Sequence, residues 1–249
     1  MAGTTGEFPA LDDDERLGLI EAGLDAAGPD RVIAHIGAPD SRRAARLAAS
    51  AAALGVTRIA AITPFYLAPR QDEVTAYYGR IRQAAPAAGL YSYVFPERTG
   101  VTVPVGQFAS LAEAVGLAGA KFSGAAARNV AACAAACPGL KIFSGDDTDL
   151  AATLSGGGAG IISARASAYP EVFSALSEAL ASGETQEAAR YQADVTAIAS
   201  TGASIGRVKE ALRVRGFDSM AARMPVDPPD ESTAARIAEL VKSVAPAAA

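Results

Sequence analysis

The residue best suited to covalent chemistry is Lys121, one of only four lysines in the chain. It lies in Gly119-Ala-Lys-Phe-Ser-Gly124, which has the pattern of a buried strand with a single lysine among small residues. Burial removes water from an ammonium group and lowers its pKa from about 10.4 toward neutrality, so the amine becomes free to attack a carbonyl carbon. The same residues also fit a lysine at the edge of a strand, with its amine extended into solvent.

Other chemically active side chains are scarce. The only histidine, His35, lies in the apolar run Arg31–Gly37, and we interpret it as a hydrogen-bonded core residue. A single histidine excludes most metal sites built from several imidazoles and weakens any serine–histidine–aspartate interpretation. The cysteines Cys133 and Cys137 share one face of an alanine-rich helical stretch, and we interpret them as small core residues of a reduced protein. Acid–base chemistry therefore falls to lysine, tyrosine, aspartate or glutamate.

The composition limits the class of protein to which the chain can belong. Half of its 249 residues are apolar and its net charge is −5, which is enough apolar material for a sizeable core in one or two domains. The acidic balance argues against nucleic-acid binding. The most apolar region, residues 47–67, is interrupted by Arg58 and Pro64, so we expect no membrane span. The first residues lack the basic and apolar segments of a secretory signal, so we expect a cytoplasmic protein.

Short apolar runs alternate with amphipathic or alanine-rich runs up to about residue 170. The apolar runs predict strands at Val32–Ile36, Arg58–Thr63, Leu90–Phe95, Ala118–Ser123, Lys141–Ser144 and Gly158–Ser163. Helices are predicted at Leu11–Leu24, Asp40–Leu54, Gln71–Ala84, Ser110–Ala118, Ala125–Ala136 and Asp149–Ser155. Such repeats of buried strand and helix favour a (β/α)8 barrel. An open doubly wound sheet is the alternative, although Gly156–Gly158 precedes a strand and is not a phosphate loop.

From Pro170 onward the sequence predicts helices alone. Helical periodicity continues through Glu171–Ala181, Glu187–Thr201, Ile205–Arg213 and Ser232–Val244. We therefore predict two domains, an N-terminally incomplete barrel over residues 1–182 and a C-terminal helical bundle over residues 183–249. Fewer strands can be recognised than the eight that close a barrel, so an open sheet edge is expected.

Short motifs occur in a fixed order at the ends of successive predicted strands. They are Gly3-Thr-Thr-Gly-Glu7, Thr63-Pro-Phe-Tyr66, Tyr93-Val-Phe-Pro-Glu-Arg-Thr-Gly100, Gly119-Ala-Lys121, Ser144-Gly-Asp-Asp147 and Gly160-Ile-Ile-Ser163. With these motifs the chain resembles the dihydrodipicolinate synthase / N-acetylneuraminate lyase family of pyruvate-dependent class I aldolases. The resemblance implies an α/β fold, a (β/α)8 TIM barrel with a C-terminal helical extension. Because family members usually carry further N-terminal residues, we expect a truncated barrel that lacks its first strand, first helix and most of its second strand.

The resemblance implies a catalytic role for four residues. Lys121 resembles the lysine that forms an imine with pyruvate, and Tyr93 resembles the tyrosine that moves protons to and from the imine and the enamine. Thr4 and Tyr66 resemble the relay partners of that tyrosine, and Tyr66 would act across a subunit interface. The alternative interpretation makes Tyr93 a core aromatic residue, Tyr66 a packing residue at a turn and Thr4 an ordinary cap.

The resemblance also implies a set of substrate contacts. Thr4 and Thr5 would hold the carboxylate of pyruvate through hydroxyl and backbone N–H groups. Arg98 would bind a carboxylate on the second substrate, and its alternative is a solvated residue of a turn. The remaining contacts would come from residues that line the pocket: Gly145, Asp147 and Ile162.

These features favour a lyase that forms a Schiff base between Lys121 and pyruvate or another 2-keto acid and catalyses aldol condensation or cleavage. The favoured interpretation is a reaction like that of 4-hydroxy-tetrahydrodipicolinate synthase. Arg98 suits a carboxylated aldehyde, and Thr148 stands where sugar-acid lyases tend to carry an acid. The alternatives are an aldolase or dehydratase of 2-keto-3-deoxy sugar acids, an N-acetylneuraminate lyase-like enzyme and, from another class, a non-catalytic truncated paralogue.

The expected partners follow from this interpretation. The ligands would be a small 2-keto acid and an aldehyde, with no nucleic acid and no membrane. We expect no metal, and no cofactor beyond the covalent imine on Lys121. The family resemblance also implies a homo-oligomer, either a dimer or a homotetramer.

Overall fold

Two compact units make up the part of the chain that the structure describes. The structure is a computed structural model that describes residues 1–218 and 220–244. The first unit contains residues 1–146 and 152–162, and the second contains residues 147–151 and the described residues from 163 onward. The sheet belongs to the first unit, whereas the second unit is helical.

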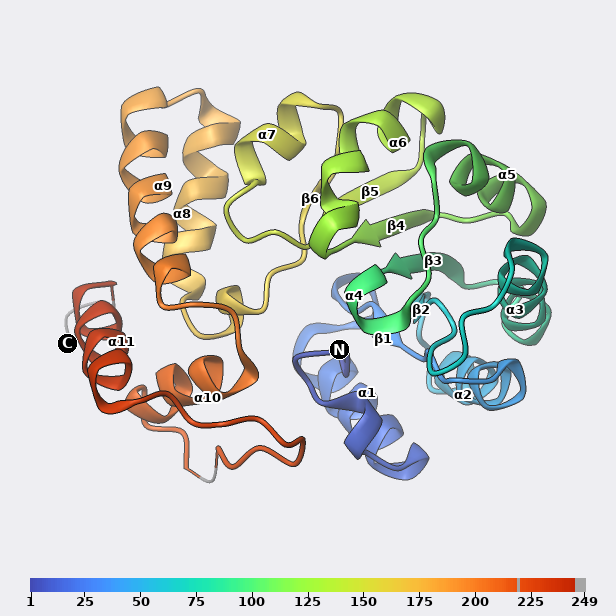
Figure 1. Ribbon diagram of the computed structural model, residues 1–249, viewed down its shortest axis with the longest axis horizontal. Coiled ribbons are helices and arrows are strands. Elements are labelled where there is room, and N and C mark those ends of the chain that lie inside the picture. Colours follow the sequence, from blue (N-terminus) through green and yellow to red (C-terminus); the bar gives the residue numbers. More distant parts are fainter. Residues whose placement is uncertain (219, 245–249) are drawn as a thin grey trace. The chain divides into compact units, whose positions relative to one another are not determined.

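Among the described residues, six parallel strands form a single sheet in the first unit (Figure 1). They are β1 (Ala34–His35), β2 (Arg58–Ile62), β3 (Gly89–Val94), β4 (Gly119–Phe122), β5 (Lys141–Ser144) and β6 (Gly160–Ile161). Each strand pairs with the next one in sequence, from β1 to β6. A doubly wound sheet reverses its strand order at a switch point, so this order removes the open doubly wound alternative. The predicted parallel α/β architecture is confirmed.

The helices of the first unit pack against one another in the same sequential order. They are α1 (Asp13–Ala27), α2 (Ser41–Ala53), α3 (Gln71–Ala84), α4 (Pro96–Thr99), α5 (Val105–Val115), α6 (Val130–Ala136) and α7 (Leu150–Ser155), whose first two residues belong to the second unit. Short 3-10 helices follow three loops, η1 (Phe8–Ala10), η2 (Pro29–Arg31) and η3 (Gly124–Asn129). Helix α1 contacts α2, α2 contacts α3, α3 contacts α5 and α5 contacts α6. Strands and helices that advance together are typical of a curved sheet with one layer of helices.

The two faces of the sheet differ in what they contact. Strand residues such as Leu90 and Phe122 are fully buried among the helices in one continuous apolar core. Tyr93 and Lys121 alternate with residues of that core along their strands, so their side chains lie on the opposite, inner face. Burial on the helix side therefore stabilises the sheet and leaves its inner face available for chemistry.

Local signals in the sequence explain most helix boundaries. Asp12 accepts the N–H of Glu15 at 2.8 Å at the start of α1, and Glu15 accepts the N–H of Asp12 in return. The prediction of Gln71–Ala84 matches α3. The helix predicted at Ser110 begins instead at Val105, directly after Pro104, because complete burial of Phe108 outweighs the weak helix preference of Gly106.

The second unit is built from helices in its described residues. They are η4 (Arg165–Ser167), α8 (Pro170–Ser182), α9 (Thr185–Ser200), α10 (Ile205–Val214) and α11 (Glu231–Val244). Helices α8 and α9 pack against each other, as do α10 and α11. Among the described residues no strand follows Pro170, in agreement with the prediction. The domain boundary predicted after Ser182 falls between α8 and α9, within this unit. The described helices include none with the length and apolarity needed to cross a bilayer.

Replacement of Gly119 by alanine should destabilise the protein by about 1–3 kcal/mol, because overpacking of a sheet forces the backbone to move. A Cβ at Gly119 would lie 2.1 Å from the carbonyl oxygen of Lys141 and 2.6 Å from the ring of Tyr91. Urea unfolding measures the change. The matched control is Gly18→Ala in α1, where a Cβ would have nothing within 4 Å. Its free energy of unfolding should rise by about 0.5–1 kcal/mol. Equal effects of the two substitutions would contradict the packing argument.

Candidate active site

The inner face of the sheet brings Lys121 and Tyr93 together. Their strands, β4 and β3, are neighbours, and the two residues are direct partners in the register of the parallel ladder. The Nζ atom of Lys121 lies 4.6 Å from the centroid of the Tyr93 ring. Lys121 is half-buried and Tyr93 is buried. An amine and a phenol therefore stand side by side at the carboxyl end of the sheet, as the sequence predicts.

The phenol of Tyr93 contacts the hydroxyl group of Thr4. The Oγ1 atom of Thr4 lies 3.3 Å from the phenol oxygen, within hydrogen-bond distance. Burial raises the pKa of Tyr93 above its ordinary value, while the hydroxyl groups of Thr4 and Ser123 and the charge of Arg98 act in the opposite direction. The phenol is therefore protonated at neutral pH and can pass its proton along a hydroxyl neighbour.

Aromatic rings surround this phenol on the inner face. Phe8 belongs to the same buried cluster as Tyr93, and Phe65 and Phe95 pack against that cluster. The rings of Tyr93 and Phe95 are 6.1 Å apart, and those of Phe8 and Phe65 are 5.8 Å apart with a nearly perpendicular orientation. Apolar surroundings strengthen each polar contact made inside them.

His35 is a core residue, which confirms its interpretation from the sequence. It is 4% exposed, and its Nε2 atom accepts the N–H of Ile62 at 3.2 Å, which leaves the ring proton on Nδ1 in the neutral form. Burial, with the charge of Arg16 acting in the same direction, holds the pKa of His35 well below its ordinary range. Arg16 donates to the carbonyl oxygens of His35 at 2.8 Å and of Gly37 at 3.1 Å. His35 therefore supports the strand end and is not placed to act as a base.

Thr4 and Thr5 lie on the tight turn before η1. The N–H of Glu7 donates to the carbonyl of Thr4 at 3.0 Å, and the N–H of Phe8 donates to the carbonyl of Gly3 at 3.3 Å. Glu7 adopts a left-handed conformation with φ of 56°, which closes the turn. The turn brings Thr4 to Tyr93, whereas Thr5 is partly exposed and its role stays a prediction.

Arg98 lies on the short helix α4, which follows β3. Its side chain is exposed and lies over the ring of Phe95, 5.7 Å from the centroid. Two hydroxyl groups position this helix, because Thr63 at the end of β2 donates to Thr99 at 3.0 Å and Thr99 donates to the carbonyl of Phe95 at 3.1 Å. The sequence predicted Arg98 in a turn, and the structure places it on α4, where its charge acts to lower the pKa of Tyr93.

Gly145 and Ile162 lie at the ends of β5 and β6, next to the inner face. The N–H of Gly145 donates to the carbonyl of Phe122 at 2.7 Å, and the N–H of Ile162 donates to the carbonyl of Ser144 at 2.8 Å. Asp147 belongs to the second unit, where its carboxylate forms an ion pair with Arg165. The predicted contact of Asp147 with substrate stays a prediction.

Tyr66 is separated from the phenol cluster within the single chain. Its side chain is 93% exposed, and Leu67 beside it is 75% exposed. Its φ of 83° is uncommon for a residue with a side chain and marks a constrained loop tip. A relay contact between Tyr66 and Tyr93 is therefore absent from the described residues of one chain.

Ser123 is the residue that the sequence analysis did not assign to the site. It follows Lys121 by two positions, so the alternation of side chains along an extended chain returns it to the same face. That spacing was visible in the sequence. Its place at the site depends on the fold, because a Cβ atom on Gly145, at the end of β5, would lie 1.9 Å from the Oγ atom of Ser123 and 2.8 Å from the Cε atom of Lys121.

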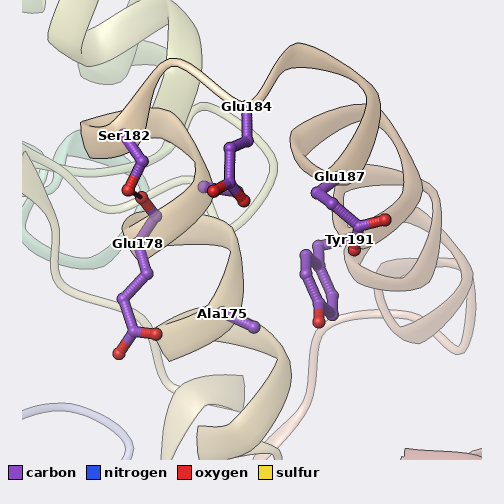
Figure 2. A pocket seen from close by; sticks show the side chains of 7 residues that line it. Ala175, Glu178, Ser182, Glu184, Glu187 and Tyr191 are labelled. Atoms are coloured by element: carbon purple, nitrogen blue, oxygen red, sulfur yellow. Dashed lines mark hydrogen bonds between the residues drawn. The ribbon is translucent and has the colours of Figure 1, made fainter.

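The second unit holds a separate hollow of about 210 Å³ between α8 and α9. Figure 2 shows that Glu178 and Ser182 project from α8, while Glu187 and Tyr191 project from α9. Its lining is rich in carboxylates, and no group of histidine, cysteine, aspartate or glutamate suited to a metal occurs among the described residues. The residues that line the hollow include no lysine, histidine or cysteine, so it lacks the amine that imine chemistry requires.

Cys133 and Cys137 also fit their interpretation as packing residues. Cys133 is fully buried in the main core, and Cys137 is partly buried against it. Burial raises the pKa of the Cys133 thiol to about 11, and the neighbouring Cys137 acts in the same direction. A thiol in this state is a poor nucleophile.

Comparison with known proteins identifies the family. A family model described as the dihydrodipicolinate synthetase family matches residues 1–244. The chain belongs to this family. An uncharacterised DapA-like lyase of Halobacterium salinarum is 35% identical over 228 residues, which cover 90% of this chain and 75% of the relative. The 4-hydroxy-tetrahydrodipicolinate synthase of Synechococcus sp. (strain WH7803) is 31% identical over 252 residues, which cover 99% and 83%.

A solved structure agrees with this assignment at the level of the fold. YagE of E. coli K12, a member of the dihydrodipicolinic acid synthase family in complex with pyruvate, matches with a TM-score of 0.88. The match has 24% sequence identity and covers 98% of this chain and 85% of that chain. The six-stranded parallel sheet therefore corresponds to the TIM barrels of the dihydrodipicolinate synthetase family. The predicted family and its enzyme class, class I lyases and aldolases, are confirmed at the level of the family.

The single histidine should stay uncharged in the folded protein at pH values at which an ordinary histidine is protonated. An unfolded histidine titrates near 6.5, whereas burial lowers the pKa of His35 well below that value. Its one set of ring signals in ¹⁵N NMR should therefore not move between pH 7.5 and about 5.5. The same signals in urea should titrate normally and serve as the control.

The same shift has a consequence for stability. Because the native pKa is depressed, His35 contributes stability that is present above the unfolded pKa and is lost as the pH falls toward the folded pKa. The melting temperature should accordingly decrease as the pH falls below about 6.5. A ring that titrates near 6.5 in the folded protein would contradict the geometry described for His35.

Proposed function

We propose that this chain is a pyruvate-dependent lyase in which Lys121 forms an imine with pyruvate or another 2-keto acid. The enamine derived from it would add to a carboxylate-bearing aldehyde, as in a reaction like that of 4-hydroxy-tetrahydrodipicolinate synthase. The observation that carries the proposal is the direct pairing of Lys121 with Tyr93, with the amine 4.6 Å from the phenol ring. The similarity to the Synechococcus synthase supports this choice of reaction.

The two side chains supply the chemistry that such a reaction needs. The amine of Lys121 adds to the ketone carbon, and loss of water gives a cationic imine. The imine withdraws electrons from the methyl group, so a methyl proton leaves and its bonding pair forms the double bond of the enamine. The phenol of Tyr93 can receive and return protons in these steps, and a contribution of about 10²–10⁴-fold is typical of such a positioned group.

The remaining residues of the inner face suit the binding of a small 2-keto acid. Thr4 and Thr5 would hold its carboxylate through hydroxyl and backbone N–H groups on a turn whose shape is fixed by its own hydrogen bonds. The backbone near Gly145 and Ile162 would border the pocket, and Asp147 is proposed as a further contact. This chemistry proceeds through the covalent imine and needs no metal or cofactor from the protein.

Tyr66 is proposed to act in a neighbouring copy of the chain. The side chain of Tyr66 is 93% exposed at a constrained loop tip, next to Leu67, which is 75% exposed. Exposed aromatic and aliphatic side chains of this kind are typical of interfaces. We therefore propose a homo-oligomer in which Tyr66 completes the hydroxyl relay of a partner's Tyr93.

Arg98 supports a carboxylated acceptor. The guanidinium is exposed on α4, directly after β3, and its charge acts to lower the pKa of the Tyr93 phenol. An arginine in such a place can bind a carboxylate through paired N–H donors. An aldehyde that carries a carboxylate would therefore be directed toward the enamine.

Incubation of the protein with pyruvate and borohydride should produce a stable adduct on Lys121, because reduction of the imine fixes the pyruvate carbon to the amine. Peptide mass spectrometry after digestion locates the adduct. The Lys121→Arg variant should give no adduct. The matched control is Lys141→Arg on the next strand, where the lysine is exposed, and this variant should react like the wild type.

The outcomes of trapping separate the main interpretations. An adduct on Lys121 supports the lyase. Folded wild-type protein without any adduct, or with an adduct that survives in Lys121→Arg, would overturn the proposal and favour a non-catalytic protein.

Arg98→Ala should raise the KM for a carboxylated aldehyde by about 10- to 100-fold, because a charge-assisted hydrogen bond contributes about 1.5–3 kcal/mol. Succinic semialdehyde can be compared with butanal, which has a similar length and lacks the carboxylate. The KM for butanal and the yield of trapped pyruvate should not change. The exposed Arg80 on α3 supplies the matched control, Arg80→Ala.

The same assay tests the alternative substrate class. Equal use of the two aldehydes by the wild type would contradict the role of Arg98. Release of pyruvate from a 2-keto-3-deoxy sugar acid, without condensation of succinic semialdehyde, would favour a sugar-acid aldolase.

A further inference from the structure

A carboxylate from the loop after β3 caps the first turn of the helix that follows β4. Glu97 lies on α4, and its Oε1 atom accepts the N–H of Ala125 at 2.7 Å. Ala125 belongs to the first turn of η3, where a backbone N–H has no partner within the helix itself. The residue before a helix usually supplies such a cap, but the side chain of Ser123 makes no capping hydrogen bond here. The cap therefore joins two loops whose bonded residues are 28 positions apart in the chain.

Gly124 leaves the space that the carboxylate of Glu97 occupies. A Cβ atom on Gly124 would lie 2.6 Å from the Cδ atom of Glu97 and would overlap the carboxylate. Gly124 also has a φ of 60°, a left-handed conformation that glycine adopts without steric cost. The short helices α4 and η3 are in contact at this point. The turn after β4 is thus shaped to receive the side chain of Glu97.

Arg98 is the residue that this contact positions. It follows Glu97 on α4, and its guanidinium lies 5.7 Å from the centroid of the Phe95 ring. That ring lies 6.1 Å from the ring of Tyr93. Of the ion pairs that the described residues form, none includes Arg98, although a carboxylate precedes it directly in sequence. Because Glu97 bonds to the backbone of η3, the N–H donors of Arg98 are available to a carboxylate from outside the chain.

A second contact holds α4 from the loop after β2. Thr63 donates to Thr99 of α4 at 3.0 Å. A helix of four residues has too few hydrogen bonds of its own to fix its orientation. The contacts with Thr63 and with Ala125 therefore supply the rigidity that the short helix lacks.

We propose that Glu97 is a positioning residue that anchors α4 to the loop after Lys121 and so directs Arg98 toward the carboxylate of the acceptor aldehyde. This inference rests on the proposed function, in which Lys121 forms the imine and Arg98 binds that carboxylate. Loss of the anchor should weaken the binding of a carboxylated acceptor. Imine formation should not change, because the pairing of β3 with β4 holds Lys121 beside Tyr93.

The first arm of the test compares two aldehydes. Glu97→Ala should raise the KM for succinic semialdehyde by about 3- to 10-fold, the effect of one hydrogen bond. The KM for butanal, which lacks a carboxylate, should stay at the wild-type value, and so should the kcat and the yield of pyruvate trapped on Lys121. Glu97→Gln keeps an oxygen that accepts the N–H of Ala125, so this variant should restore most of the affinity for succinic semialdehyde.

Glu73 on α3 supplies a matched control. Its Oε2 atom accepts the N–H of Arg70 at 2.7 Å, the same kind of bond and the same length as that between Glu97 and Ala125. Glu73→Ala therefore removes a carboxylate cap from a helix that carries no residue of the proposed site. The KM for either aldehyde should not change in this variant.

The second arm needs no activity. Exchange of the Ala125 amide hydrogen in D₂O is followed by ¹⁵N NMR at neutral pH. Because Glu97 accepts this N–H, Glu97→Ala should speed the exchange by about 3- to 10-fold, whereas Glu97→Gln should stay closer to the wild type. The amide of Arg70 should respond to Glu73→Ala in the same way.

The two arms separate this inference from the proposed function. Wild-type exchange of the Ala125 amide in Glu97→Ala would overturn the role of Glu97. An unchanged KM for succinic semialdehyde, an equal rise in KM for both aldehydes, or a Glu97→Gln variant as weak as Glu97→Ala would also overturn it. Faster exchange in Glu97→Ala, together with no pyruvate trapped by the wild type, would overturn the proposed function and the catalytic part of this inference, and only the contact would remain.

Discussion

The candidate site depends on the register between β3 and β4. Parallel strands lie about 4.8 Å apart, so residues that are partners in the ladder hold their side chains at contact distance. In this register Tyr93 faces Lys121, and the amine lies 4.6 Å from the phenol ring. A slip by one residue would turn Lys121 toward the helices and place a charge in the main apolar core. Burial of Phe122 and Leu90 in that core therefore protects the geometry of the reactive pair.

Small residues leave room around this pair, and a side chain from another loop caps the neighbouring turn. Gly119 and Gly145 stand where any Cβ would meet a neighbouring strand or side chain. Glu97 caps the turn after β4 by accepting the N–H of Ala125, and the side chain of Ser123 makes no capping hydrogen bond there. These contacts come from different βα loops, so the site is precise only because the sheet fixes the loops relative to one another.

Much of the architecture could be predicted from local patterns. The predicted bounds of α3 agree with the structure, because Gln71 follows a loop and the apolar residues of the helix recur at helical spacing. The start of α5 was missed, since its first turn contains Gly106 and is helical because Phe108 is buried. The place of Ser123 beside the site was missed for a similar reason, because its nearest neighbours there, Gly145 and Lys121, come from different parts of the fold.

The sequence by itself determined the alternation of strands and helices, the core faces and the residue types able to form an imine, because these depend on spacing and on side-chain chemistry. The motifs around Lys121 and Tyr93 also determined the family. Only the tertiary structure decided the contact of Thr4 with Tyr93, the depressed pKa of His35 and the exposure of Tyr66. The physical reason is that pairing between strands far apart in the chain fixes distances and burial, and neither quantity is encoded in any single stretch of sequence.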